Sequence, residues 1–109
     1  MERLEHALKH SKTLGKSRAS FIYLIGCHDF TKVGIADNPE RRLMELQVGC
    51  PYQLKILATL ATPNAVRDEA MLHAMWKRYE VLGEWFLLPA GELASAMNAD
   101  DVSQVLGRK

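Results

Sequence analysis

Tyr23 is the first of four features of this sequence that could do chemistry. It stands in a run of apolar residues, and its phenol can donate and accept hydrogen bonds and take part in proton transfer. The alternative interpretation is a tyrosine of the hydrophobic core. The residue type alone is compatible with both.

The adjacent pair Arg41 and Arg42 is the second feature. Successive residues of a helix point about 100° apart, so one side chain can reach solvent while the other turns toward a sheet. A guanidinium in that position could hold a phosphate through two hydrogen bonds and offset charge in a transition state. The alternative is a pair of exposed helix arginines.

Glu69 is the third feature, because it shares a helical face with Leu72, His73 and Trp76. A carboxylate on a packing face must be paired, hydrated or bound to a metal, since its burial without a partner is costly. One carboxylate with several waters is a common way to hold Mg²⁺ against phosphates. An ion pair between Glu69 and His73 that only stabilises the helix is an equal alternative.

The fourth feature is the run Gly83-Glu84-Trp85-Phe86, in which a turn glycine and an acid precede two aromatic residues. Phe86 is expected to lie in the core. Trp85 is compatible with the edge of the core or with a platform on which a nucleobase stacks.

Composition and charge limit the class of protein. The 109 residues carry a formal net charge of +1, which does not indicate nucleic-acid binding by bulk electrostatics. The five Lys or Arg and two Glu of residues 1–20 form either a solvated basic segment or an arm that contacts phosphates. Cys27 and Cys50 are expected to be free thiols, because no zinc-ligand spacing accompanies them. The lack of a long apolar run or secretory signal predicts a cytoplasmic protein without membrane contact.

The elements that must position these side chains follow from hydrophobic periodicity and from helix start and stop signals. Two apolar segments joined by a short turn predict a hairpin. Asp37 or Asn38 can cap the next helix, because Pro39 suits its first position. The expected helices cover residues 2–14, 39–48, 65–81, 90–98 and 100–106, and the expected extended segments cover residues 21–26, 31–35, 54–60 and 84–88.

This order predicts an α+β fold with a small three-stranded antiparallel sheet flanked by helices. Residues 1–20 are expected to form an extra N-terminal helix and linker, residues 21–89 the main domain, and residues 90–109 a helical C-terminal tail. The apolar stripe of Leu4 and Leu8 is too narrow to fold alone. We therefore expect the N-terminal helix to pack on the domain or to mediate self-association.

Several short motifs follow one another in a specific order. They are IYLI at 22–25, KVGIA at 32–36, NPERRL at 38–43, ELQ at 45–47 before Gly49, Glu69-x-x-Leu72-His73, and Gly83-Glu84-Trp85-Phe86. Together they span about residues 21–88, most of the chain. This combination resembles the GIY-YIG nuclease superfamily, in the branch named for a phage T5 reading frame and for a fungal meiotically up-regulated gene product.

The resemblance implies a GIY-YIG-like domain and a metal-dependent endonuclease that uses one Mg²⁺ or Mn²⁺. By position, Tyr23 is the tyrosine that orients or deprotonates the attacking water. Arg42 is the arginine that contacts the scissile phosphate, and Glu69 is the glutamate that holds the metal. His73 and Glu84 also match motif positions, and His73 is included with the catalytic residues.

Two motif positions differ from the family pattern. The first motif reads Phe21-Ile22-Tyr23 and lacks its glycine, and Lys32 replaces the tyrosine of the second motif. Lys32 could hold a phosphate or lower the pKa of Tyr23 or of a water, so it is expected to serve both catalysis and substrate binding. Arg41 and Trp85 are expected to be further substrate contacts.

The expected function is hydrolysis of DNA phosphodiester bonds by in-line attack of water. One alternative is a nucleic-acid-binding module of the same fold that does not cut, and another is a structural or regulatory subunit. DNA is the expected partner. The near-neutral charge suggests that a second copy of the chain or another protein contributes affinity.

Overall fold

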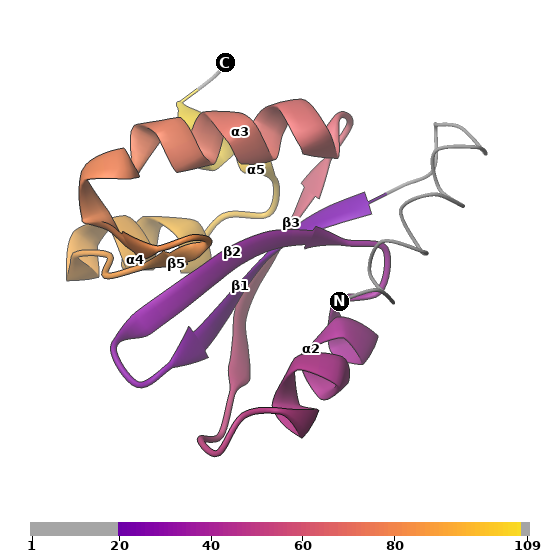
Figure 1. Ribbon diagram of the computed structural model, residues 1–109. Helices are drawn as coiled ribbons and strands as arrows, with labels where there is room; N and C mark the ends of the chain where they lie inside the picture. The colour runs from indigo at the N-terminus through magenta and orange to yellow at the C-terminus, as the bar shows by residue number, and fades with distance from the viewer. Residues whose placement is uncertain (1–19, 108–109) are drawn as a thin grey trace.

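The protein is an α+β domain built on one five-stranded antiparallel sheet (Figure 1). The computed structural model describes residues 20–107, so the predicted helix over residues 2–14 lies outside the described residues. The strand order is β3-β1-β2-β5-β4. The strands are β1 (Ser20–Cys27), β2 (Phe30–Ala36), β3 (Lys55–Thr62), β4 (Glu80–Leu82) and β5 (Trp85–Phe86).

Helices cover both faces of this sheet. They are α2 (Pro39–Val48), α3 (Ala65–Met75), α4 (Ala90–Met97) and α5 (Val102–Leu106), with a 3-10 turn, η1 (Lys77–Tyr79), after α3. Figure 1 shows α2 on one side of the long strands and α3 on the other. In the described part of the chain, no helix has the length and apolar character needed to cross a bilayer.

The predicted number of strands is wrong, because β4 and β5 extend the sheet. The expected helix over residues 65–81 ends at Met75, where Trp76 leaves helical geometry with ψ at 15°. Glu80–Leu82 then pairs with Trp85–Phe86 around Gly83, whose φ of +58° suits the first position of a tight hairpin turn. Gly83 therefore forms a hairpin turn and does not end a helix.

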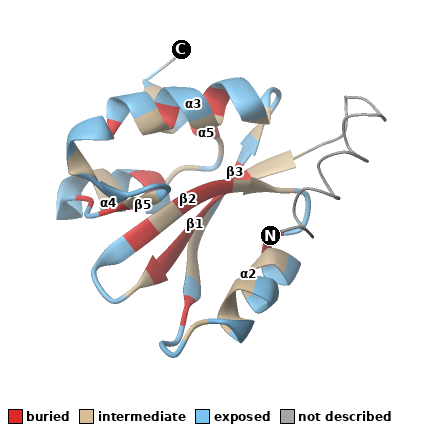
Figure 2. Cartoon of the chain, viewed as in Figure 1, coloured by how far each residue is buried: buried red, intermediate tan, exposed pale blue. Residues whose placement is uncertain are grey.

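β1 divides the interior into two apolar clusters, because successive residues of a strand point to opposite faces. Ile22 and Leu24 pack with Leu72 and Trp76 of the α3 side, whereas Tyr23 and Ile25 face the α2 side. Figure 2 shows these buried strand segments between the exposed outer surfaces of the helices. β1 is therefore the shared wall of both clusters.

The segment predicted as a C-terminal tail packs into the larger of the two clusters. Ala96 of α4 and Val102 of α5 are fully or almost fully buried there. Asp101 caps α5 by accepting hydrogen bonds from the backbone N–H groups of Ser103 and Gln104. These contacts join residues 90–106 to the sheet.

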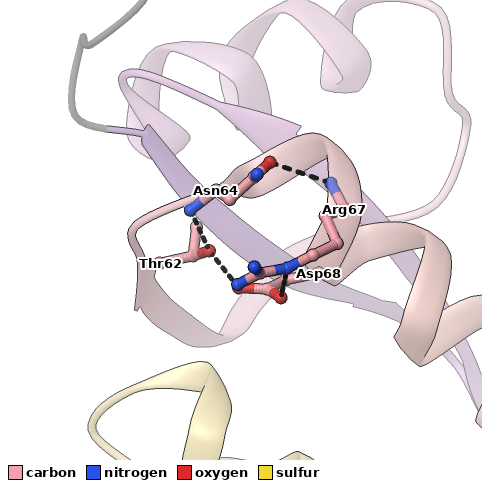
Figure 3. A network of polar contacts seen from close by, with 4 residues as sticks. All are labelled: Thr62, Asn64, Arg67 and Asp68. Carbon is pink, nitrogen blue, oxygen red and sulfur yellow. Dashed lines mark hydrogen bonds and ion pairs between the residues drawn. The ribbon is translucent and has the colours of Figure 1, made fainter.

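A polar network fixes the start of α3 to the end of β3 (Figure 3). Asp68 is fully buried and accepts a 2.6 Å hydrogen bond from the Thr62 hydroxyl and a 3.0 Å bond from Arg67 Nε. Asn64 caps the helix by accepting a hydrogen bond from the Arg67 backbone N–H. Because a buried carboxylate needs such partners, this network sets the direction in which α3 leaves the sheet.

Candidate active site at the edge of β2

The candidate site lies where the pairing between β2 and β5 stops. β5 pairs with β2 only at Thr31 and Lys32. At the next residue, the Val33 N–H donates to the Glu84 carbonyl at 3.0 Å, and the Val33 carbonyl lies 3.1 Å from His73 Nε2. A carbonyl can only accept, so His73 Nε2 carries a proton in this contact. A side chain of α3 thus takes the place of a neighbouring strand at this edge.

Tyr23 reaches this edge from the α2 side of the sheet. It is 2% exposed and lies opposite Gly34 in the register of β1 and β2. A Cβ atom at Gly34 would lie 2.5 Å from Tyr23 Cζ and closer still to the hydroxyl. Tyr23 is therefore a core tyrosine, as one interpretation predicted, and its ring also lies across β2 in space that only a glycine leaves open.

Arg42 of α2 lies beside the Tyr23 phenol. Burial raises the pKa of Tyr23, the hydrogen bond and charge of Arg42 lower it, and the charges of Glu84 and Glu69 raise it, with a net increase. The phenol is therefore neutral near pH 7. Arg42 also bonds Glu45 at 3.2 Å, while its Nε is buried without a hydrogen-bond partner in the described structure.

Glu69 and His73 approach the same edge from α3. Glu69 Oε2 lies 3.8 Å from His73 Nε2, so the predicted pair within one helix is present as a loose contact. Burial raises the pKa of Glu69 and so does the charge of Glu84, whereas His73 and Lys32 lower it, with a net increase. The positive charges of His73 and Lys32 therefore do not fully offset the burial of Glu69 and the repulsion from Glu84. An ion pair with His73 alone would lower the pKa of Glu69, not raise it.

Lys32 and Glu84 complete the cluster from β2 and the β4–β5 turn. Lys32 Nζ lies 3.0 Å from Glu84 Oε1 and 5.6 Å from the centre of the Trp85 ring. Lys32, which stands where the resemblance predicts a tyrosine, is thus held by an ion pair and an aromatic ring. Its charge acts on Glu69 from there.

The candidate residues approach this strand edge from both sides of the sheet. Tyr23 and Arg42 belong to the α2 side, whereas Glu69 and His73 belong to α3 on the other side (Figure 1). The charges of Glu84 and Glu69 nevertheless raise the pKa of the Tyr23 phenol, which packs over Gly34.

Arg41 does not join this cluster. Arg41 is exposed, and its backbone N–H donates to the Asn38 side chain that caps α2. Adjacent positions of a helix diverge, so α2 directs only Arg42 toward Tyr23.

The donor set is compatible with one hard divalent cation. Glu69 and Glu84 are two carboxylates close enough to raise the pKa of Glu69, and a bound cation would relieve that repulsion. No group of three or more His, Cys, Asp or Glu residues with metal-binding geometry occurs within residues 20–107. Waters and phosphate oxygens would therefore supply most of the ligands, as is usual for Mg²⁺.

Sequence reasoning understated Glu84 and missed Gly34. Glu84 was noted as a motif residue, but its contact with Lys32 depends on a hairpin that periodicity did not reveal. The signal for Gly34 was available, because a glycine inside a strand often marks close approach of another group.

A comparison with protein-family models matches the T5orf172 domain over residues 20–106. Neither the curated proteins nor the solved structures give a significant match to the chain. The match covers the whole sheet, the cluster at the edge of β2, and α4 and α5. The chain therefore belongs to the T5orf172 domain family.

Proposed function

We propose that the protein is a metal-dependent endonuclease that hydrolyses DNA phosphodiester bonds. The proposal rests on the position of the Tyr23 phenol, which packs over Gly34 beside Arg42 and is close enough to Glu69 for that charge to raise the pKa of Tyr23. A module that only binds nucleic acid gains nothing from a half-buried carboxylate near phosphates, because like charges repel. The resemblance of the same motifs to GIY-YIG nucleases supports this choice.

Arg42 would bind the scissile phosphate. Its pKa stays above the ordinary value because Tyr23 and Glu45 outweigh the lowering effect of burial, so the guanidinium remains charged. A planar cation of this kind suits the developing negative charge on phosphate oxygens.

Tyr23 would orient the attacking water and not deprotonate it. Its raised pKa keeps the phenol neutral at physiological pH, when it can both accept and donate a hydrogen bond. His73 is the better base. Its Nε2–H donates to the Val33 carbonyl, so Nδ1 is the nitrogen that would accept the proton that the water releases as it attacks phosphorus.

Glu69 would hold one Mg²⁺ or Mn²⁺, with Glu84 close by. A divalent cation there supplies Lewis-acid stabilisation of the phosphate and acidifies a bound water. Lys32 neutralises Glu84 in the absence of substrate and adds positive charge for the phosphate backbone.

The alternative of a binding module without hydrolysis rests on one observation. Lys32 occupies the position of the second family tyrosine and is engaged by Glu84. A protein that binds DNA equally with and without metal and cuts none of it would favour this alternative.

The proposal is tested by incubating the protein with supercoiled, linear and single-stranded DNA, and with RNA, in Mg²⁺, Mn²⁺ or EDTA. Cleavage that requires metal and is lost in Arg42→Ala supports it. Arg78→Ala is the control, because Arg78 is an exposed arginine of η1 to which no role in the cluster is assigned. Failure of the wild-type protein to cut any of these nucleic acids in either metal contradicts hydrolysis.

A further inference from the structure

A row of side chains leads from the candidate site to the outer edge of the sheet. Lys32 pairs with Trp85 across β2 and β5, and Trp85 pairs with Leu82 across β5 and β4. Paired residues of antiparallel strands point to the same face. Lys32, Trp85 and Leu82 therefore lie side by side on the α2 side, and we call these three residues the β5 ledge.

The outer part of the β5 ledge is open. α2 packs against β1, β2 and β3, and Figure 1 shows this helix away from the β4–β5 hairpin. Trp85 is partly exposed and Leu82 is 74% exposed. The row therefore changes from a packed end beside Lys32 to an uncovered apolar end at Leu82.

The size and position of the β5 ledge indicate its occupant. Stable protein interfaces bury roughly 1,200 Å² or more, which two apolar side chains cannot supply. One nucleobase, in contrast, stacks on a single aromatic ring with useful affinity. Lys32 and the neighbouring Glu84 also belong to the site where a scissile phosphate would lie, so a base on the β5 ledge would belong to the same strand.

We propose that the β5 ledge binds an unpaired nucleobase next to the scissile phosphate, so that the protein acts on nucleic acid with single-stranded or bulged nucleotides. This inference rests on the proposed function for the location of the phosphate. Bases within a duplex are stacked on their neighbours and cannot lie on Trp85 without leaving the helix. A continuous duplex is therefore a poor ligand.

The test measures binding in EDTA, so that it does not depend on cleavage. Fluorescence anisotropy compares a labelled single strand, the same sequence as a duplex, and a duplex with an unpaired bulge. The wild type should prefer the single strand and the bulge. Leu82→Ala should weaken both by about tenfold, because it removes apolar surface that the base would cover, with little change for the duplex. Val81→Ala is the matched control, since Val81 is an exposed apolar neighbour without a partner in the register of β5.

A second measurement reports on Trp85 directly. The chain has two tryptophans, so Trp76→Phe leaves Trp85 as the only one. Its fluorescence should be quenched by the single strand and not by the duplex. Because Leu82 is exposed, Leu82→Ala retains the fold and gives a result even where Trp76→Phe is unstable.

Equal binding of single strand and duplex, no binding at all, or wild-type affinity in Leu82→Ala would overturn the β5 ledge. The two proposals fail separately. A protein that binds unpaired strands through Leu82 but cuts nothing contradicts hydrolysis alone. A protein that cuts duplex DNA, and whose Leu82→Ala variant binds single strand and bulge as tightly as the wild type, contradicts the β5 ledge alone.

Discussion

Replacement of Glu69 by glutamine separates its electrostatic role from its packing role. Glutamine keeps the size of the side chain but cannot supply the negative charge that would hold a divalent cation. Because a metal contributes several kcal/mol to the transition state, we expect cleavage to fall by about 100-fold or more, which is roughly 2.7 kcal/mol of activation free energy. Plasmid nicking measured over a range of Mn²⁺ concentrations gives this ratio.

The same substitution has a predicted effect on folding. The folded-state pKa of Glu69 is raised by burial and by Glu84, so ionisation of Glu69 favours the unfolded state as pH increases. Glu69→Gln removes this penalty at pH 7 and loses a contact with His73 worth a few tenths of a kcal/mol. The free energy of unfolding should therefore stay equal or rise slightly at pH 7. The difference should vanish below about pH 4.3, where an ordinary glutamate is protonated in both states.

Glu40→Gln is the matched control, because Glu40 is an exposed residue in the first turn of α2. It should leave cleavage unchanged. The reasoning about Glu69 is refuted if Glu69→Gln cuts as fast as the wild type at every Mn²⁺ concentration. A large loss of stability at pH 7 would instead show that the carboxylate is a structural ion-pair partner.

Three further substitutions test the surrounding structure. Gly34→Ala should displace the Tyr23 ring and lower the free energy of unfolding by about 1–3 kcal/mol in urea titrations, whereas Gly91→Ala, which meets no atom within 4 Å, should be neutral or stabilising. Equal effects of the two alanines would contradict the close packing of Tyr23. Asp68→Ala should cost about 1–3 kcal/mol in the same titrations, because it removes the hydrogen bonds that the buried carboxylate accepts from Thr62 and Arg67, and a loss below about 0.5 kcal/mol would exclude a structural role for this network. Gly83→Ala should cost about 1 kcal/mol in thermal unfolding because of its positive φ, and an unchanged melting temperature would mean that the turn adapts.

Local signals were sufficient for the first half of the fold. Turn residues at 28–29 separate β1 from β2, and Asn38 with Pro39 starts α2 as expected. The predicted α+β class is confirmed. Each of these features depends on residues that are neighbours in sequence, and therefore the residue pattern alone is enough to predict it.

The second half shows where local signals stop being sufficient. The apolar spacing of Leu72, Trp76 and Tyr79 continues a helical pattern past Met75, yet Glu80–Leu82 is a strand. That strand exists because Trp85 and Phe86 are available to pair with it and with β2. Pairing of this kind is a tertiary effect that overrides propensity.

The candidate site divides in the same way. Tyr23, Arg42 and Glu69 could be selected from residue type and helical position. Their meeting at an edge could not, because it depends on the end of β5 pairing at Lys32 and on the missing side chain of Gly34. The role of Glu84 follows from the same edge.

The central position of β1 has a consequence for motion. Its backbone is hydrogen-bonded to β2 on one side and to β3 on the other, so its amides should be among the slowest to exchange with deuterium. β4 has three exposed residues and pairs only with β5 among the described strands, so its amides should exchange through small local openings. Tyr23 thus belongs to the strand whose backbone should open least often, whereas Leu82 and Glu84 belong to the β4–β5 hairpin, which should open more readily. The β4–β5 hairpin can therefore open locally while β1 keeps its pairing with β2 and β3.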